Sequence, residues 1–516
     1  MREEFKQLSV AEFFKRNRQV TGFMNPTRAV YQTVKELIEN AFDATETYGI
    51  LPHIRLEISH FDKSRSFLEI SCEDNGIGIL PSYIPRAFGK VLFGSKFVLR
   101  QTRGIFGLGV KMAVLYGQIT TGYPVEVITS PINSDYTYRY LIKVNIEKNE
   151  PIVIKRERRK NQNGHGTKVK LIIEGNWGKA KSKVLEYIRR TAVICPYSSF
   201  NVKYPDENGA KRLVIKRRSD KLPLQPKKAF PHPYGIDVET LKSMIRKEKS
   251  DINLISFLVK RFSGVGLKTA EEFLTANKFN PRKKIRELKE KEIVEIVHAM
   301  KKWKWRPPPA SCLSPVGVEN IEIGLKSMFK AEIAYATTRK PSSYSGHPFI
   351  VEVGIAYGGK IPLMEKPLLL RFANKIPLIY DEGVDVATAV VNDIDWRSYR
   401  IKFPAPLVVL THVCSTKIPF HTLGKEAIAD IPEIESEIRL AIQEVARKIR
   451  LYISKKEARE AVAKKKVEVS KYFPVIASSV SSVLPQTDPQ YLVSLMMKNF
   501  RSRLKSEEES YEQREN

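Results

Sequence analysis

The stretch Arg103-Gly104-Ile105-Phe106-Gly107-Leu108-Gly109-Val110-Lys111 stands directly before an apolar segment, 112–116, whose composition favours a helix. Glycine lets the backbone turn its amides toward one point at little steric cost. A helix start adds unpaired amides and the positive end of the helix dipole. The stretch therefore predicts an anion-binding loop. A plain flexible loop would have a similar composition, so the interpretation depends on the rest of the chain.

The charge of the chain indicates what kind of anion to expect. Lys and Arg number 87 against 57 Asp and Glu among 516 residues, which gives a formal net charge of +30. Such an excess favours association with nucleic acid, because binding to phosphates releases counterions. A generally basic proteome or a ribosome-associated scaffold is the alternative explanation.

The composition also predicts where the protein works. No run approaches the roughly 18 to 20 apolar residues of a membrane span, and the first residues lack the apolar core of a signal peptide. We therefore expect an intracellular protein with no membrane contact. Its four cysteines are scattered along the chain, so reduced and mostly buried thiols are expected rather than a zinc site or disulfides.

Residues 26–230 are expected to form one α+β domain. A helix from Pro26 to about residue 48 carries Glu36 and Asn40 on one polar face, away from its apolar stripe. A solvated, charged helix face is the alternative for these residues. The region closes with a helix at about 179–195, and the basic, proline-spotted residues 200–230 are predicted to be a linker or exposed loop.

The strands of this domain are predicted from alternating apolar residues. One of them ends at Asp74, which precedes Gly76 and Gly78, a pattern that lets a ligand approach the backbone closely. The predicted strands are 54–59, 67–72, 125–129, 136–146, 152–155 and 167–173.

Taken together, these stretches resemble the three motifs of the GHKL ATPase family, which unites type II topoisomerases, Hsp90-like chaperones, MutL-like repair proteins and histidine kinases. Glu36 with Asn40 fits the first motif, Asp74 with Gly78 fits the second, and the glycine run 104–111 fits the third. The resemblance implies a Bergerat-type α/β sandwich that binds ATP and Mg²⁺.

The resemblance also implies a role for each helix residue. Glu36 is the expected catalytic base, which accepts a proton from, or orients, the water that attacks the γ-phosphate. Glu39 lies about 60° around the same helix and is the alternative base, although a supporting position is expected for it. Asn40 offers an oxygen ligand to magnesium, whose other ligands are phosphates and water.

The remaining motifs supply the expected nucleotide contacts. Asp74 accepts a hydrogen bond from the adenine amino group, and Gly78 lets the base lie against the backbone. Ser95 and Lys96 resemble a neighbouring nucleotide contact. The phosphates are wrapped by the amides of Gly104, Ile105, Phe106, Gly107, Leu108, Gly109, Val110 and Lys111, with added charge from Lys111.

Residues 231–306 are predicted to be helical, with Gly264-Val265-Gly266 opening a helix at their centre. A glycine-flanked turn of this kind can present amides to a DNA phosphate without reading sequence. The segment looks like a helix-two-turn-helix insert. A small helical packing module is the alternative.

Residues 307–470 are similar to the transducer domain of the same family, with predicted strands at 349–356, 368–372 and 407–414 before a long helix from 427 to about 467. The family's transducer sends a lysine to the γ-phosphate. Lys425 is our candidate, because a lysine at a helix start is disfavoured by the dipole unless it has another partner. Lys417 is the alternative. Asp393 and Asp395 follow a predicted helix, which argues against a cleavage-type metal site.

The predicted order is an N-terminal arm (1–25), an ATPase domain (26–230), the helical insert (231–306), a transducer (307–470) and a C-terminal helical region with an acidic tail (471–516). This order is similar to that of ATPase subunits of type IIB DNA topoisomerases. The similarity implies double-stranded DNA as substrate, ATP-driven pairing of two copies, and a separate DNA-cleaving A subunit in an A2B2 heterotetramer.

The same similarity implies a cytoplasmic, nucleoid-associated protein of archaeal type. A MutL-like repair clamp and an Hsp90-like chaperone are the rival functions. The helical insert is not expected in the first, and the charge of +30 favours DNA over a client protein.

Overall fold

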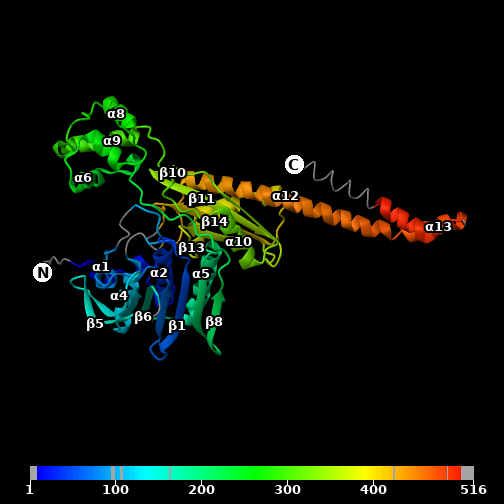
Figure 1. Ribbon diagram of the computed structural model, residues 1–516, viewed down its shortest axis with the longest axis horizontal. Helices are drawn as coiled ribbons and strands as arrows, with labels where there is room; N and C mark the ends of the chain where they lie inside the picture. Colours follow the sequence, from blue (N-terminus) through cyan, green and yellow to red (C-terminus); the bar gives the residue numbers. More distant parts are fainter. Residues whose placement is uncertain are drawn as a thin grey trace, which may run out of the picture.

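The computed structural model describes residues 8–94, 99–104, 108–161, 164–421, 425–484 and 486–500. Figure 1 shows two sheets, each covered by helices, a separate helical module, and one helix that extends far beyond the rest. The predicted contacts at Ser95 and Lys96, and those at Ile105, Phe106 and Gly107, lie outside the described residues.

The first sheet has eight strands in the order β5-β4-β3-β6-β2-β1-β7-β8. Neighbouring strands are antiparallel except β1 and β7, which are parallel. The strands are β1 (His53–Asp62), β2 (Phe67–Asp74), β3 (Val125–Ser130), β4 (Tyr136–Asn145), β5 (Glu150–Lys160), β6 (Gly166–Glu174), β7 (Ser199–Asp206) and β8 (Gly209–Ile215).

Three helices, α2 (Pro26–Glu46), α4 (Gly109–Thr121) and α5 (Trp177–Ile194), cover one face of this sheet (Figure 1). Asn25 fixes the start of α2, since its side chain accepts a hydrogen bond from the Arg28 amide and Pro26 takes the first turn. The short helices α1 (Val10–Arg16) and α3 (Ile84–Gly89) complete this part. The sheet and its helices thus hold α2 and the start of α4 next to the end of β2.

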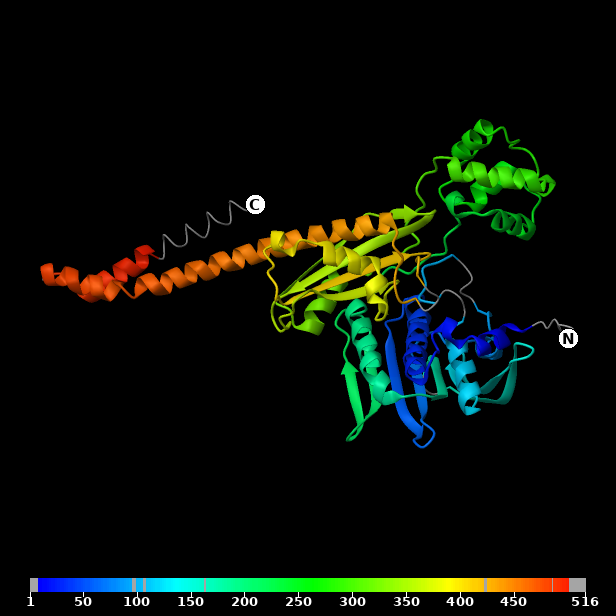
Figure 2. The ribbon, with the colours of Figure 1, turned by 180° about the vertical axis from the view of Figure 1, so that it is seen from behind.

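A helical module with its own core follows. It contains α6 (Val238–Lys247), α7 (Leu254–Arg261), α8 (Leu267–Ala276) and α9 (Glu290–Lys302). Phe257, Phe273 and Trp305 are among its buried residues. In Figures 1 and 2 this module stands apart from the first sheet, beside one end of the second.

The second sheet runs in the order β10-β11-β14-β12-β13, with β9 paired to β11. Its strands are β9 (Ile333–Thr338), β10 (Ser342–Tyr344), β11 (His347–Tyr357), β12 (Leu368–Ala373), β13 (Ile376–Leu378) and β14 (Leu407–Ser415). The helices of this part are α10 (Val318–Phe329), α11 (Val386–Asp393) and α12 (Pro432–Ser470), and α13 (Phe473–Val483) follows.

The long helix α12 packs on the second sheet with only its first half. Its buried residues run from Ile434 to Ser454, and the rest extends into open space before α13 (Figure 2). Among the described residues, no helix combines the length and apolar character needed to cross a bilayer.

Two predictions about local structure are wrong. Residues 200–215 are not a linker but form most of β7 and all of the edge strand β8, and Phe200, Val202 and Tyr204 of β7 are buried. The basic residues on the open face of these strands gave them the composition of a loop. The second error concerns α12, which begins at Pro432, so Lys425 lies in a preceding loop and not at a helix start.

Other predictions are confirmed. The helix before Asp393 is α11, and the Asp393 carboxylate pairs with Arg439 at 2.5 Å. All four cysteines are free and buried. Asp393 is therefore an ion-pair partner of α12.

Candidate active site

Glu36 lies at the centre of α2, with its carboxylate against the start of α4. The side chain is 7% exposed, and Gln32 Nε2 donates to its Oε1 at 2.9 Å. A Cβ atom built on Gly109 would lie 1.6 Å from Glu36 Oε2. A side chain at the first residue of α4 would therefore displace the Glu36 carboxylate, which lies beside the amide end of that helix.

Asn40 follows one turn later on the same face of α2. Its Nδ2 donates to the Glu36 carbonyl at 2.8 Å. Because this bond turns the amide nitrogen toward the helix backbone, the side-chain oxygen faces away from it. The Asn40 side chain is therefore fixed to the backbone of α2 through its amide nitrogen.

Asp74 ends β2, and the loop after it folds tightly back. Asp74 Oδ1 accepts a hydrogen bond from the Gly76 amide at 2.8 Å. Burial raises the pKa of Asp74 to about 7, although hydrogen bonds from the Gly76 and Thr167 backbones oppose the rise. Gly78 has φ +72, and a Cβ there would lie 2.4 Å from the Ser130 carbonyl. Glycine is thus required where the loop contacts β3.

Sequence reasoning missed two threonines, one opposite Asp74 and one that holds the loop after it. Thr129 Oγ1 accepts from the Ile79 amide at 2.9 Å and lies 3.0 Å from Thr167 Oγ1. Thr167 stands opposite Asp74 in the β2–β6 pairing. The strand register that brings them together was not predicted, and the sequence signal was only the glycine-threonine pair at the start of β6.

The described ends of the glycine run are firmly held. Arg103 is buried over the Phe42 ring, 4.4 Å from its centroid, and donates two hydrogen bonds to Glu46 at 3.0 and 2.9 Å. At the other end Lys111 is buried in α4, and its ammonium donates to the Phe93 carbonyl. Both ends are therefore anchored to the first sheet domain.

Lys425 reaches this site from the second sheet domain. Its Nζ donates to the Arg103 carbonyl at 2.9 Å and lies 3.8 Å from Glu39 Oε2. Its backbone is in the left-handed region, with φ +57. A non-glycine residue in that region carries strain of about 1 to 3 kcal/mol.

Lys417, the alternative lysine, is placed elsewhere. It is exposed and lines a hollow of about 380 Å³ between the helical module and the second sheet, together with Tyr234 and His347. The structure thus brings Lys425, and not Lys417, next to α2.

Glu39 is the unusual residue of the site. Its side chain is 1% exposed, and within the part of the chain that the structure describes neither carboxylate oxygen has a hydrogen-bond partner. Burial raises the pKa of Glu39 to about 7, while Lys425 opposes the rise. A buried carboxylate next to a lysine but without a donor is a costly arrangement, which fits a site built around a further polar group.

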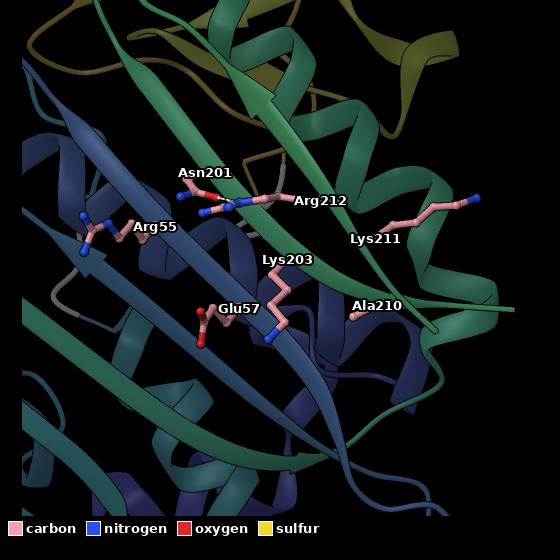
Figure 3. Close-up of a pocket in the computed structure, with 7 residues that line it drawn as sticks. All are labelled: Arg55, Glu57, Asn201, Lys203, Ala210, Lys211 and Arg212. Carbon is pink, nitrogen blue, oxygen red and sulfur yellow. Dashed lines mark hydrogen bonds between the residues drawn. The ribbon is translucent and has the colours of Figure 1, made fainter. Parts of the chain in front are cut away.

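A hollow of about 490 Å³ lies outside this site. Figure 3 shows its lining on the open face of β1, β7 and β8, with Arg55, Glu57, Lys203 and Arg212 among the residues. These side chains alternate with buried residues that face the helices, so they point away from α2. The hollow is a basic surface and not a part of the Glu36 site.

Comparison with known proteins gives the two sheet domains a family. Residues 25–174 match the model for histidine kinase-, DNA gyrase B- and HSP90-like ATPases. Residues 308–465 match the model for the transducer of the topoisomerase VI B subunit. The ATPase match supports ATP as the ligand of the Glu36 site.

Curated relatives cover nearly the whole chain. The B subunit of type 2 DNA topoisomerase 6 from Pyrobaculum aerophilum is 49% identical over 481 residues, which cover 93% of this chain and 90% of the relative. The proteins of the same name from Sulfurisphaera tokodaii (95% and 92% covered) and Saccharolobus solfataricus (94% and 91% covered) are each 48% identical.

These matches decide against the repair clamp and the chaperone, because the transducer model and the relatives all carry the name of the same topoisomerase component. The chain is the ATPase subunit of a DNA topoisomerase, with its ATPase and transducer domains joined by the helical module. It belongs to the family of type 2 DNA topoisomerase 6 B subunits.

Proposed function

We propose that this chain binds magnesium-ATP between α2, the end of β2 and the start of α4, and that ATP binding closes two copies of the chain around DNA. The observation that carries the proposal is the contact of Glu36 with Gly109. It sets a buried carboxylate beside the amide end of a helix, where phosphate groups bind well.

Glu36 is proposed as the catalytic base. Its Oε1 is held by Gln32, so the carboxylate has a fixed direction from which it accepts a proton of the attacking water. Glu39 is proposed to support the site and not to replace Glu36, since it faces Lys425.

Asp74 is proposed to accept the adenine amino group, with Gly78 allowing close approach of the base. The amides of the glycine run 104–111 are proposed to surround the phosphates, and Ser95 and Lys96 to contribute neighbouring contacts. Thr167 would fix Asp74 through its backbone hydrogen bond, and Thr129 would fix the following loop by accepting from the Ile79 amide.

Lys425 is proposed to contact the γ-phosphate. Its ammonium already lies beside Glu39 and the Arg103 carbonyl, at the entry to the glycine run. A cation there stabilises the negative charge that develops on the phosphoryl oxygens. This cation belongs to the second sheet domain. Hydrolysis of ATP in the first sheet domain would then remove a contact of the second sheet domain.

Asn40 is the proposed protein ligand of Mg²⁺, and its side-chain oxygen is of the type that this ion prefers. Magnesium needs few protein ligands when phosphates and water supply the rest, and the Asn40 side chain is oriented by its bond to the Glu36 backbone. When bound, the ion would neutralise phosphate charge.

The partners are proposed to be a second copy of this chain, an A subunit that cleaves DNA, and double-stranded DNA, in an A2B2 heterotetramer. The net charge of +30 supports contact with DNA. The projecting end of α12 with α13 exposes Val467, Tyr472, Val475 and Val483, an apolar surface suited to a protein partner.

A relaxation assay tests this proposal. The chain is mixed with the DNA-cleaving partner and supercoiled plasmid, and ATP and Mg²⁺ are each omitted in turn. We expect relaxation only in the complete mixture. Relaxation without ATP, or full ATP-dependent relaxation by the cleaving partner on its own, would contradict the proposal.

A further inference from the structure

A buried polar cluster joins the two sheet domains beside the nucleotide site. Its centre is Glu46, at the end of α2, which accepts two hydrogen bonds from Arg103 and one from Tyr197 at 2.8 Å. The ammonium of Lys375, from the turn between β12 and β13, lies 3.3 Å from Glu46 Oε2. One carboxylate is thus shared by cations from both domains.

The cluster is well shielded from water. The side chains of Arg103 and Lys375 are each 5% exposed, and that of Glu46 is 10% exposed. The two cations lower the pKa of Glu46 to about 2, against the effect of burial. An ion pair at such depth is strong in its low-dielectric surroundings, and loss of one partner leaves a buried charge uncompensated.

The backbone of the second sheet domain aims Lys375 at Glu46. Asn374 and Lys375 both have left-handed φ values, +48 and +65. His412 Nε2 accepts a hydrogen bond from the Lys375 amide at 3.0 Å, while His412 Nδ1 donates to the buried Glu352 at 2.9 Å. Positive φ at both central residues is the geometry of a two-residue hairpin turn, here between β12 and β13, so the turn itself fixes the direction of Lys375.

A second set of contacts, made by the side chain of Asn374, also joins the two sheet domains. Asn374 Nδ2 donates to the Thr102 carbonyl at 3.3 Å and to the Ser415 carbonyl at 3.0 Å. Thr102 and Arg103 immediately precede Gly104. The two residues that lead into the glycine run are therefore both tied to the turn that carries Lys375.

We propose that Lys375 is a positioning residue for ATP binding: through Glu46 it holds Arg103, and thereby the entry of the glycine run, to the transducer sheet. This role rests on the proposed function, since it takes ATP as the ligand of the run. Lys375 does not contact the nucleotide, because its ammonium is held by Glu46 and by Ser314 Oγ at 3.0 Å.

The role differs from that of Lys425 in a measurable way. Without Lys375, Arg103 is held less firmly, so ATP binding must also fix Arg103 in place. This free-energy cost is the same for the bound ground state and for the transition state. Such a change raises KM and leaves kcat largely unaffected. A lysine that contacts the γ-phosphate changes kcat.

The test is the ATP hydrolysis rate of the whole A2B2 complex, measured against ATP concentration, for the variants Lys375→Met and Lys375→Arg. We expect Lys375→Met to raise KM about fivefold or more, and Lys375→Arg, which keeps the charge, to recover most of the change. Arg339→Met is the matched control, because Arg339 pairs with Glu437 and Glu444 on α12 within the transducer domain.

A double variant adds a test of the route. If Lys375 acts through Glu46, Lys375→Met combined with Glu46→Gln should be no worse than Glu46→Gln alone. If the double variant instead has a KM raised by the product of the two single effects, Lys375 does not act through Glu46. If Glu46→Gln fails to fold, the single Lys375 variants still test the proposal. Equal KM values for Lys375→Met and Arg339→Met would overturn the inference. A wild-type complex that neither binds nor hydrolyses ATP would instead overturn the proposed function.

Discussion

Lys425 Nζ lies 3.8 Å from Glu39 Oε2, so a loop of the second sheet domain places its ammonium against the helix that carries Glu36. The same ammonium donates to the Arg103 carbonyl at 2.9 Å. One side chain therefore contacts both α2 and the entry of the glycine run. Any movement between the two domains changes the charge around the site.

Replacing Lys425 with Met should abolish most ATP hydrolysis while the chain stays folded. A preorganised charge at the transferring phosphoryl group contributes roughly 10² to 10³ in kcat. Steady-state hydrolysis of the whole complex measures the effect. Lys417→Met is the control, because Lys417 lies at the hollow beside the helical module, and its kcat should stay near that of the wild type. The reverse result would assign the phosphate contact to Lys417.

Gly109→Ala should block the site by steric conflict. The added Cβ would lie 1.6 Å from Glu36 Oε2, so either α4 or the carboxylate must move. We expect nucleotide affinity to fall at least about tenfold, since one displaced phosphate contact costs about 1.4 kcal/mol or more. Binding of a fluorescent ATP analogue measures it.

Gly266→Ala is the matched control for that prediction. Gly266 stands at a helix start as well, directly before α8, but no atom lies within 4 Å of a Cβ built there. Equal affinities for the two variants would mean that the start of α4 is not part of the nucleotide site.

Nucleotide affinity should depend on pH through Asp74. Its pKa is raised from 3.8 to about 7, so in the free protein the carboxyl is protonated below that pH. A protonated acid is a poorer acceptor for the adenine amino group. Affinity should therefore fall by up to about tenfold per pH unit below pH 7, and Asp74→Asn should remove this dependence.

Glu39 must be controlled in this experiment, because burial raises its pKa to about 7 as well. Its effect has the opposite sign: the carboxylate formed above pH 7 repels the phosphates, so acid favours binding through Glu39. In Glu39→Gln only the Asp74 dependence should remain. An affinity that is flat between pH 5.5 and 8 in Glu39→Gln would contradict the adenine role of Asp74.

Arg28 should matter for hydrolysis although it lies outside the three motifs. Its guanidinium pairs with Glu426, the neighbour of Lys425, and lies 3.4 Å from the centroid of the Tyr380 ring. Arg28→Met frees this side of the Lys425 loop, so kcat should fall about fivefold or more. Arg55→Met, on the open face of β1, should leave kcat unchanged. Similar kcat values for the two variants would contradict the positioning of Lys425 by Arg28.

Much of the first sheet domain could be predicted from sequence because its signals are local. The helix periodicity around Glu36 and Asn40, and the alternation that ends at Asp74, each lie within a few residues. β7 and β8 were missed for a physical reason: β7 carries basic and polar residues on its open face, and the edge strand β8 is exposed along most of its length, so their composition resembles a loop.

Contacts between distant segments could not be predicted in the same way. The strand register that pairs Asp74 with Thr167 depends on the whole sheet. The meeting of Arg103, Glu46 and Lys375 depends on how the two domains pack. Lys425 was selected by resemblance to a transducer, and the helix-start argument offered for it is wrong, since α12 begins at Pro432.

The most direct test of the account is ATP binding and hydrolysis by Glu36→Gln. The amide keeps an acceptor for Gln32 and the shape of the side chain, but it cannot take a proton from water. We predict an unchanged affinity for ATP within about threefold, and a kcat reduced by roughly 10² or more. An unchanged kcat at saturating ATP would show that Glu36 is not the base and would contradict the site described above.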